Sequence, residues 1–375
     1  MVLDEIIKLK MTVFQTSIIK NTLIAIVSAL IGLVLFEVLA GFVLRKEFSN
    51  DHERSRRYML FGTSDNTPAF RNQGNIFIYK PNAIIRPTAY YENGTALHQE
   101  YDYEFKTNNF GLVQKLNIEK DRPSLLVLGD SFTEGQGATP WFYSLEEGNG
   151  SKKIQLINGG LLGTGFAQWK LLHDHLVNSE IRINKVVVPF ISDDYQRVVW
   201  NFPDRVLSCL GDIEKCKGDE GYFPRPFGFD EEAFVSKLRK FRDAEYADKQ
   251  SIKERRFFRR YFPNIHFIWG YIKNEYKIRF TNTNSSAIEY LSQKYGKNIV
   301  FIHIPTQEEL ERGRAPNHLG QLAREKIERS GGKLIDGFNI CGLEPIDYFI
   351  NDPHPNQNGY KKIAKCVDKA IQGLD

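Results

Sequence analysis

A serine and a histidine that could perform nucleophilic chemistry lie far apart in this chain. Ser131 follows the apolar run 124–129, and Asp352 and His354 stand two residues apart on a Pro-rich segment near the C-terminus. A serine hydroxyl is a weak nucleophile alone, so it needs a neighbouring base, and that base needs a third group to orient it. The pattern predicts Ser131 as the nucleophile, His354 as the general base and Asp352 as the orienting carboxylate. The structural alternative is that Ser131 and Asp130 only cap the start of a helix.

Five short apolar runs frame these residues. Stretches of helix length separate the runs, which is typical of buried parallel strands joined by crossover helices. The runs cover residues 124–130, 153–160, 185–192, 298–305 and 333–337. The sequence therefore predicts an α/β fold, a three-layer α/β/α sandwich of flavodoxin-like type with about five parallel strands. Ser131 would leave the carboxyl end of the first strand, where ligands bind in open sheets of this kind.

Two separated motifs carry a family resemblance. The sequence GDSFTEG (129–135) closes the first predicted strand, and DPHPNQNGY (352–360) precedes the last predicted helix. In this order they resemble the SGNH hydrolase superfamily of GDSL-like esterases and acyltransferases. The resemblance covers the chain from residue 124 to the C-terminus apart from an insertion, and it implies an SGNH fold and ester chemistry. The usual spacing in that family is Asp-x-x-His, whereas here Asn351 stands three residues before His354 and Asp352 only two.

The resemblance also implies an oxyanion hole. The family completes this hole with the amide of the serine, here Ser131, and with a glycine that follows the second strand. The segment INGGLLGTG offers Gly163 for that position, with Gly160 and Gly165 as alternatives. The glycine would present a backbone N–H to the developing oxyanion, although Gly163 could equally serve only to permit a tight turn.

An asparagine after the third strand is the remaining oxyanion donor of the family, and this chain departs from it. The segment FISDDYQR places Asp193 where the asparagine is expected. An ionised carboxylate about 4 Å from an oxyanion would repel it by on the order of 4 kcal/mol. Either Asp193 is protonated, or it points elsewhere, or Ser192 donates instead. Such a departure is compatible with acyl transfer to a sugar hydroxyl in place of water.

The apolar run 22–44 is long enough to cross a bilayer as a helix. We expect an N-terminal tail over 1–21, a single-pass transmembrane helix over 22–44, and a catalytic domain on the extracytoplasmic side, in the periplasm or at the cell surface. A cleaved signal peptide is the second interpretation. Glu37 interrupts the run, and we expect it to reach toward the headgroups. Four cysteines could form disulfides or be buried thiols: Cys209, Cys216, Cys341 and Cys366.

The remaining segments have a coarser pattern. Short aromatic and β-branched runs predict a small β-rich accessory segment over 45–122, followed by the SGNH-like catalytic domain over 123–375 with a mostly helical insertion over 196–290. The net charge of +4, from 50 basic and 46 acidic residues, does not indicate a nucleic-acid binder. The arginine- and aromatic-rich stretch 255–262 is interpreted as a solvated helix face. The histidines at 173, 175 and 303 have no accompanying carboxylate cluster, so no metal site is expected.

These features together predict a serine-dependent acyl-ester enzyme that works through an acyl-Ser131 intermediate. It would be an esterase, a deacetylase or an O-acetyltransferase acting on carbohydrate or another cell-envelope ester, without a cofactor. An acylated carbohydrate or similar ester is the expected substrate, and a membrane partner could deliver the acyl group. Two alternatives stay open: a non-catalytic polysaccharide-binding or assembly protein on the same fold, and a lipid esterase.

Overall fold

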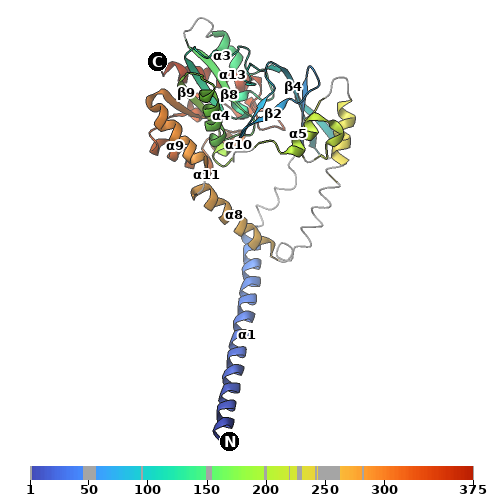
Figure 1. Ribbon diagram of the computed structural model, residues 1–375, viewed down its shortest axis with the longest axis vertical. Helices are drawn as coiled ribbons and strands as arrows, with labels where there is room; N and C mark the ends of the chain where they lie inside the picture. Colours follow the sequence, from blue (N-terminus) through green and yellow to red (C-terminus); the bar gives the residue numbers. More distant parts are fainter. Residues whose placement is uncertain are drawn as a thin grey trace. The chain divides into compact units, whose positions relative to one another are not determined.

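The computed structural model describes most of the chain (Figure 1). The described residues are 2–44, 56–93, 96–148, 154–197, 201–218, 220–225, 230–240, 243, 262–280 and 283–374. The arginine- and aromatic-rich stretch 255–262 lies outside them except for Phe262. The chain divides into a smaller unit, residues 1–54 and 244–277, and a larger unit, residues 55–243 and 278–375. Each unit is described separately.

A five-stranded parallel sheet is the centre of the larger unit. Its strands are β7 (Ser124–Gly129), β8 (Gln155–Gly160), β9 (Ile183–Phe190), β11 (Ile299–His303) and β12 (Lys333–Asp336). They lie in the order β12-β11-β9-β7-β8, and every pairing is parallel. Numbered along the chain this is the order 2-1-3-4-5 of flavodoxin-like sheets. The predicted fold class is therefore confirmed, and each of the five apolar runs forms one strand.

Alternating side chains of these strands face two separate cores, because successive residues of a strand point to opposite faces. Leu126 and Leu128 of β7 join the core beneath α4 (Phe166–Asn178), α9 (Thr283–Tyr295) and α11 (His318–Arg329). Leu125 and Val127 join the core beneath α3 (Phe142–Gly148) and α13 (Gln357–Gln372). The result is the three-layer sandwich whose helices flank the strands in Figure 1.

A second sheet precedes the sandwich in the sequence. Strands β1 (Arg56–Thr63), β4 (Ile84–Asn93) and β5 (Ala96–Asp102) pair antiparallel, and β6 (Phe105–Lys106) pairs with β4. The insertion adds β10 (Tyr222–Pro224), which pairs parallel with β1, while β2 (Phe70–Gln73) and β3 (Ile76–Tyr79) form a separate hairpin. We call β1, β4, β5, β6 and β10 the accessory sheet. One of its faces shares the sandwich core, so the two sheets fold as one unit.

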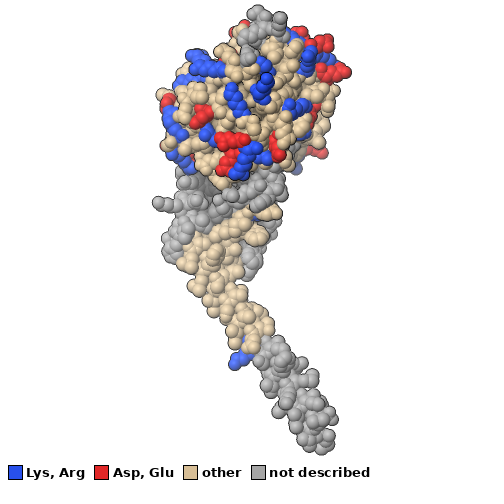
Figure 2. All heavy atoms as spheres, turned by 90° about the vertical axis from the view of Figure 1, so that its left-hand side faces the viewer, with Lys and Arg blue, Asp and Glu red and all other residues tan. Residues whose placement is uncertain are grey.

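Short elements complete the larger unit. They are α2 (Ser131–Glu134), η2 (Ser192–Tyr195), α5 (Asp204–Gly211), η3 (Ile213–Lys215), η4 (Gly296–Asn298), α10 (Gln307–Glu311), α12 (Gly337–Ile340) and η5 (Pro345–Asp347). All four cysteines form disulfides, Cys209 with Cys216 and Cys341 with Cys366. On the face shown in Figure 2, basic and acidic side chains are interspersed over this unit.

The smaller unit contains helix α1 (Val2–Leu44) and most of helix α8 (Pro263–Phe280). Within α1, residues Lys20–Gly41 are long and apolar enough to span a membrane, a test that a signal sequence also passes. The carboxylate of Glu37 accepts the backbone N–H groups of Asn264 and Ile265 at 2.7 and 2.9 Å. These N–H groups belong to the first turn of α8 and have no partner within the helix, so Glu37 satisfies them at the end where a helix favours negative charge.

Candidate active site

The structure brings Ser131 and His354 together at the carboxyl end of β7. Asp130 caps α2 by accepting the N–H of Phe132 at 2.9 Å, so Ser131 is the first residue of a short helix. Gly129 permits this turn, because a Cβ there would stand 1.9 Å from the hydroxyl of Thr133. His354 lies on the loop before α13, and its Nε2 is 2.7 Å from Ser131 Oγ.

Asp352 holds the other side of the histidine ring. Its Oδ1 contacts His354 Nδ1 and also accepts the backbone N–H of His354 at 3.0 Å. Burial alone would raise the pKa of Asp352, but the charges of His354 and Arg57 and the hydrogen bonds to its carboxylate hold that pKa well below its usual range. Because an ionised carboxylate only accepts, Nδ1 carries the proton and Nε2 is free to accept from Ser131. This is the arrangement that a nucleophile and general base require.

The spacing of Asp352 is resolved by where Asn351 lies. The side-chain N–H of Asn351 donates to Glu100 Oε2 at 2.7 Å, and its backbone N–H donates to Glu100 Oε1 at 3.1 Å. Asn351 is therefore engaged with β5, and Asp352, at the second position before His354, makes the contact with the ring.

The loop that carries Gly163 is fixed by Glu134. Leu162 donates its N–H to Glu134 Oε2 at 2.9 Å, and the hydroxyl of Tyr79 donates to Oε1 at 2.8 Å. Burial raises the pKa of Glu134 to about 8. Gly163 has φ 69° and is partly exposed. The left-handed conformation favours glycine there, so the turn interpretation and the oxyanion interpretation of Gly163 are compatible.

The two alternative glycines, Gly160 and Gly165, lie where neighbouring backbone leaves no room for a side chain. A Cβ at Gly160 would stand 2.3 Å from the backbone N of Glu134, and one at Gly165 would stand 2.5 Å from the carbonyl of Asp194. The N–H of Gly160 also donates to Asn158 Oδ1 at 2.9 Å, so it is not available to an oxyanion.

The segment after the third strand forms η2, which carries both candidates for the third oxyanion position, Ser192 and Asp193. Their surroundings differ. The hydroxyl of Ser192 is buried and contacts both His303 Nε2, at 3.0 Å, and Glu309 Oε1, at 2.5 Å. Since Arg324 donates to His303 Nδ1 at 2.8 Å, the ring proton of His303 sits on Nε2 and points to Ser192, whose own proton goes to Glu309. The hydroxyl of Ser192 is thus fully used within the fold.

Asp193 is exposed beside that network. The surrounding protein removes part of the water from its carboxylate, which raises the pKa of Asp193, and the charge of Arg197 opposes this effect. Arg197 itself donates to Asp130 at 2.7 Å and to Asp194 at 2.5 Å, and lies 3.4 Å from the carbonyl of Thr164. One guanidinium therefore ties together the three loops that bear Ser131, Gly163 and Asp193, and its role was not visible in the sequence.

Comparisons with known proteins find similar solved structures, all of low sequence identity. Neither protein-family models nor curated proteins give a match. The chain is similar to a lipase/acylhydrolase from Enterococcus faecalis, with 12% identity, a TM-score of 0.36, and coverage of 67% of this chain and 96% of that one. It is also similar to the psychrotrophic esterase EstA from Pseudoalteromonas sp. (13%, TM-score 0.35, 67% and 97%) and to a member of the lipolytic protein G-D-S-L family from Veillonella parvula (12%, 0.32, 67% and 98%). With TM-scores below 0.5, these likenesses add nothing to what the chain's own residues imply.

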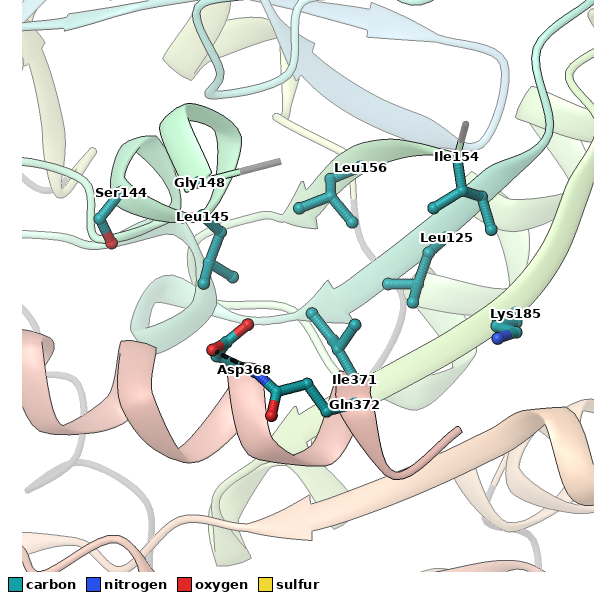
Figure 3. A pocket seen from close by; sticks show the side chains of 10 residues that line it. All are labelled: Leu125, Ser144, Leu145, Gly148, Ile154, Leu156, Lys185, Asp368, Ile371 and Gln372. Carbon is teal, nitrogen blue, oxygen red and sulfur yellow. Dashed lines mark hydrogen bonds between the residues drawn. The ribbon is translucent and has the colours of Figure 1, made fainter. Parts of the chain in front are cut away.

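A cavity of ≈ 300 Å³ lies elsewhere, at the amino ends of the strands (Figure 3). Leu125, Ile154 and Lys185 line it from the starts of β7, β8 and β9, and Asp368 and Gln372 line it from the end of α13. Ser131 leaves the opposite end of β7, so this cavity is not part of the candidate site.

Proposed function

We propose that this chain is a serine-dependent acyl-ester enzyme of the SGNH type that works through an acyl-Ser131 intermediate. The observation that carries the proposal is the 2.7 Å contact between Ser131 Oγ and His354 Nε2 with Asp352 on the other ring nitrogen. A serine that only capped a helix would have no need of an oriented histidine. All three side chains are at least nine-tenths buried, which strengthens the electrostatic coupling among them.

The reaction follows from these positions. Ser131 Oγ attacks the acyl carbonyl carbon while its proton passes to His354 Nε2. The N–H groups of Ser131 and Gly163 are the proposed donors to the oxyanion, and Asp193 occupies the position of the family's third donor. Collapse of the tetrahedral adduct releases the alcohol with the proton from His354. A second hydroxyl, from water or from a sugar, then gives its proton to His354 and attacks the acyl carbon. The bond to Ser131 Oγ breaks as His354 returns the proton to that oxygen, which regenerates the free serine.

The proposed substrate is an acylated carbohydrate or another cell-envelope ester, with acetyl as the first acyl group to test. Two features favour an extracytoplasmic, membrane-anchored enzyme: the apolar helix α1 and the two disulfides, since disulfides persist mainly in oxidising compartments. A membrane partner that supplies acyl groups would fit the transferase version, in which the exposed Asp193 lies beside the acceptor.

The test is intact-mass spectrometry of the full chain in detergent after exposure to a serine-directed phosphonate. We expect one adduct on the wild type and on Ser144→Ala, a control at a serine remote from the site, and none on Ser131→Ala or His354→Ala. A wild type that stays unlabelled while a known serine hydrolase reacts would overturn the acyl-serine mechanism in favour of the non-catalytic alternative. The rates of hydrolysis of p-nitrophenyl esters, from acetyl to long-chain acyl, test the lipid-esterase alternative. A lipid esterase would hydrolyse the long-chain esters fastest.

A further inference from the structure

The two oxygens of Asp352 have different partners. Oδ1 is used by His354, the next residue but one in the chain. Oδ2 is used by side chains that come more than 250 residues earlier in the chain: it accepts the hydroxyls of Tyr91 and, at 3.0 Å, Tyr101, and lies 4.0 Å from the guanidinium of Arg57. The carboxylate is 1% exposed, so these donors replace the water that it has lost.

All three distant residues belong to the accessory sheet. Arg57 of β1 pairs directly with Tyr91 of β4, so their side chains lie on the same face. Tyr101 of β5 pairs with Ala89, two residues from Tyr91 on that strand. The sheet therefore presents a compact set of donors to a single carboxylate.

A register shift in β5 places Tyr101 beside another contact to the same loop. Ala89 pairs with Tyr101 while Tyr90 pairs with Gln99, so Glu100 is an extra residue on β5. Such bulges re-aim side chains and are frequent beside active sites. Here the adjacent residues Glu100 and Tyr101 hold the adjacent residues Asn351 and Asp352. The accessory sheet thus contacts the loop of His354 at two successive positions, Asn351 and Asp352.

The contact also reaches the nucleophile helix. The side-chain amide of Gln136 donates to the hydroxyl of Tyr101 at 2.7 Å, and Gln136 follows directly after α2 and its cap. The hydroxyl of Tyr101 can then direct its own proton to Asp352. Burial raises the pKa of Tyr101 well above its usual value, and burial with the charge of Asp352 does the same for Tyr91, so both phenols remain donors.

We propose that Tyr91 and Tyr101, with Arg57, are positioning residues that fix the orientation of Asp352, so that the accessory sheet is a working part of the catalytic centre and not a separate module. This inference rests on the proposed function. The donors to Oδ2 stop the carboxylate of Asp352 from rotating away from His354. They also stabilise its ionised form.

The test uses the full chain in detergent with Tyr91→Phe, Tyr101→Phe and the double variant. The rate of phosphonate labelling and the kcat for p-nitrophenyl acetate should fall about tenfold for each single change, which corresponds to one lost hydrogen bond to a charge, with KM unchanged because neither tyrosine is placed against substrate. The acid limb of the pH–rate profile should move to higher pH, since Asp352 binds a proton more readily without these donors. The matched control is Tyr103→Phe, whose ring packs on Tyr101 with centroids 5.8 Å apart but whose hydroxyl makes no hydrogen bond to Asp352.

The result that overturns the inference is a folded double variant with the labelling rate and acid limb of the wild type. A reactive wild type beside such a variant leaves the proposed function standing, whereas an unreactive wild type removes the proposed function itself. In the latter case the downfield Nδ1 proton resonance of histidine-labelled protein decides the positioning role. Its loss or shift in the tyrosine variants, and not in Tyr103→Phe, supports the inference, and an unchanged resonance contradicts it.

Discussion

The pairing of Asp352 with His354 is made within one tripeptide. Pro353 separates them, and a single carboxylate oxygen of Asp352 accepts both the ring N–H and the backbone N–H of His354. The histidine is therefore oriented by its own loop, and the loop is in turn oriented by residues elsewhere in the fold. Substitutions at adjacent positions of this loop should have very different effects.

We expect Asp352→Asn to lower kcat by on the order of 10³- to 10⁴-fold, because an amide can stabilise the wrong tautomer of His354. The change Asn351→Ala should lower kcat by less than about tenfold, since Asn351 contacts Glu100 and not the ring. Steady-state kinetics with p-nitrophenyl acetate measure both. Equal losses in the two variants would show that the family spacing, with Asn351 in the orienting position, describes this loop better.

Motif residues could be predicted from the sequence, and their supports could not. Ser131 and His354 were identifiable because each lies in a short run of residues with a recognisable pattern. Tyr91, Tyr101 and Arg197 carry no local signal, because their partners are set by how strands and loops meet. Glu37 is a similar case: its partners in α8 are 227 and 228 residues away, so the sequence offered only its unusual position within an apolar run.

At the scale of elements, α11 packs closely on η2 through a glycine. A Cβ at Gly320 would stand 2.1 Å from Ser192 Oγ and 2.6 Å from His303 Cε1. Both neighbours are buried and hydrogen-bonded, so neither can move without breaking a contact. This helix position tolerates glycine alone, even though glycine is a poor helix former.

Gly320→Ala should therefore lower the free energy of unfolding by about 1–3 kcal/mol, although alanine improves helix propensity. Gly373→Ala, at the end of α13 with only ordinary contacts around its Cβ, should change stability by less than about 0.5 kcal/mol. Urea unfolding in detergent, followed by circular dichroism, gives both values. A stabilised Gly320→Ala variant would mean that α11 and η2 are farther apart than described.

The five parallel strands were predictable because buried strands are continuous apolar runs bounded by turns, as at β7 and β9. The accessory sheet was harder. Its strand β10 comes from the insertion and pairs with β1 more than 160 residues earlier in the chain. The sequence predicted β-structure over 45–122, but it contained no signal that this sheet would share the sandwich core or reach the catalytic loop.

At the scale of the whole molecule, buried ionisable groups link stability to pH. His303 is fully buried, and burial with the charge of Arg324 lowers its pKa to about 3. In the unfolded chain a histidine titrates near 6.5, so between these values the unfolded state binds a proton that the folded state does not. The contribution of His303 is complete above about pH 6.5 and is lost as the pH falls toward 3.

We predict that the wild type loses stability relative to His303→Gln as the pH falls from 6.5 to 5, by up to about 1.4 kcal/mol per pH unit. The comparison with the variant is essential, because Glu134, with its pKa raised to about 8, contributes a slope of opposite sign between its unfolded value and 8. Urea titrations of both proteins at several pH values give the difference. Parallel curves would contradict a neutral, buried His303.

The distance along the chain between the proposed nucleophile and its proposed base has a consequence during synthesis. Ser131 leaves the ribosome 223 residues before His354, and the last helix, α13, must follow before the loop of His354 is held in place. In the proposed mechanism, Ser131 therefore stays unreactive in a growing chain until the segment through α13 has been made. Prematurely terminated chains would be inert instead of acting indiscriminately on cellular esters.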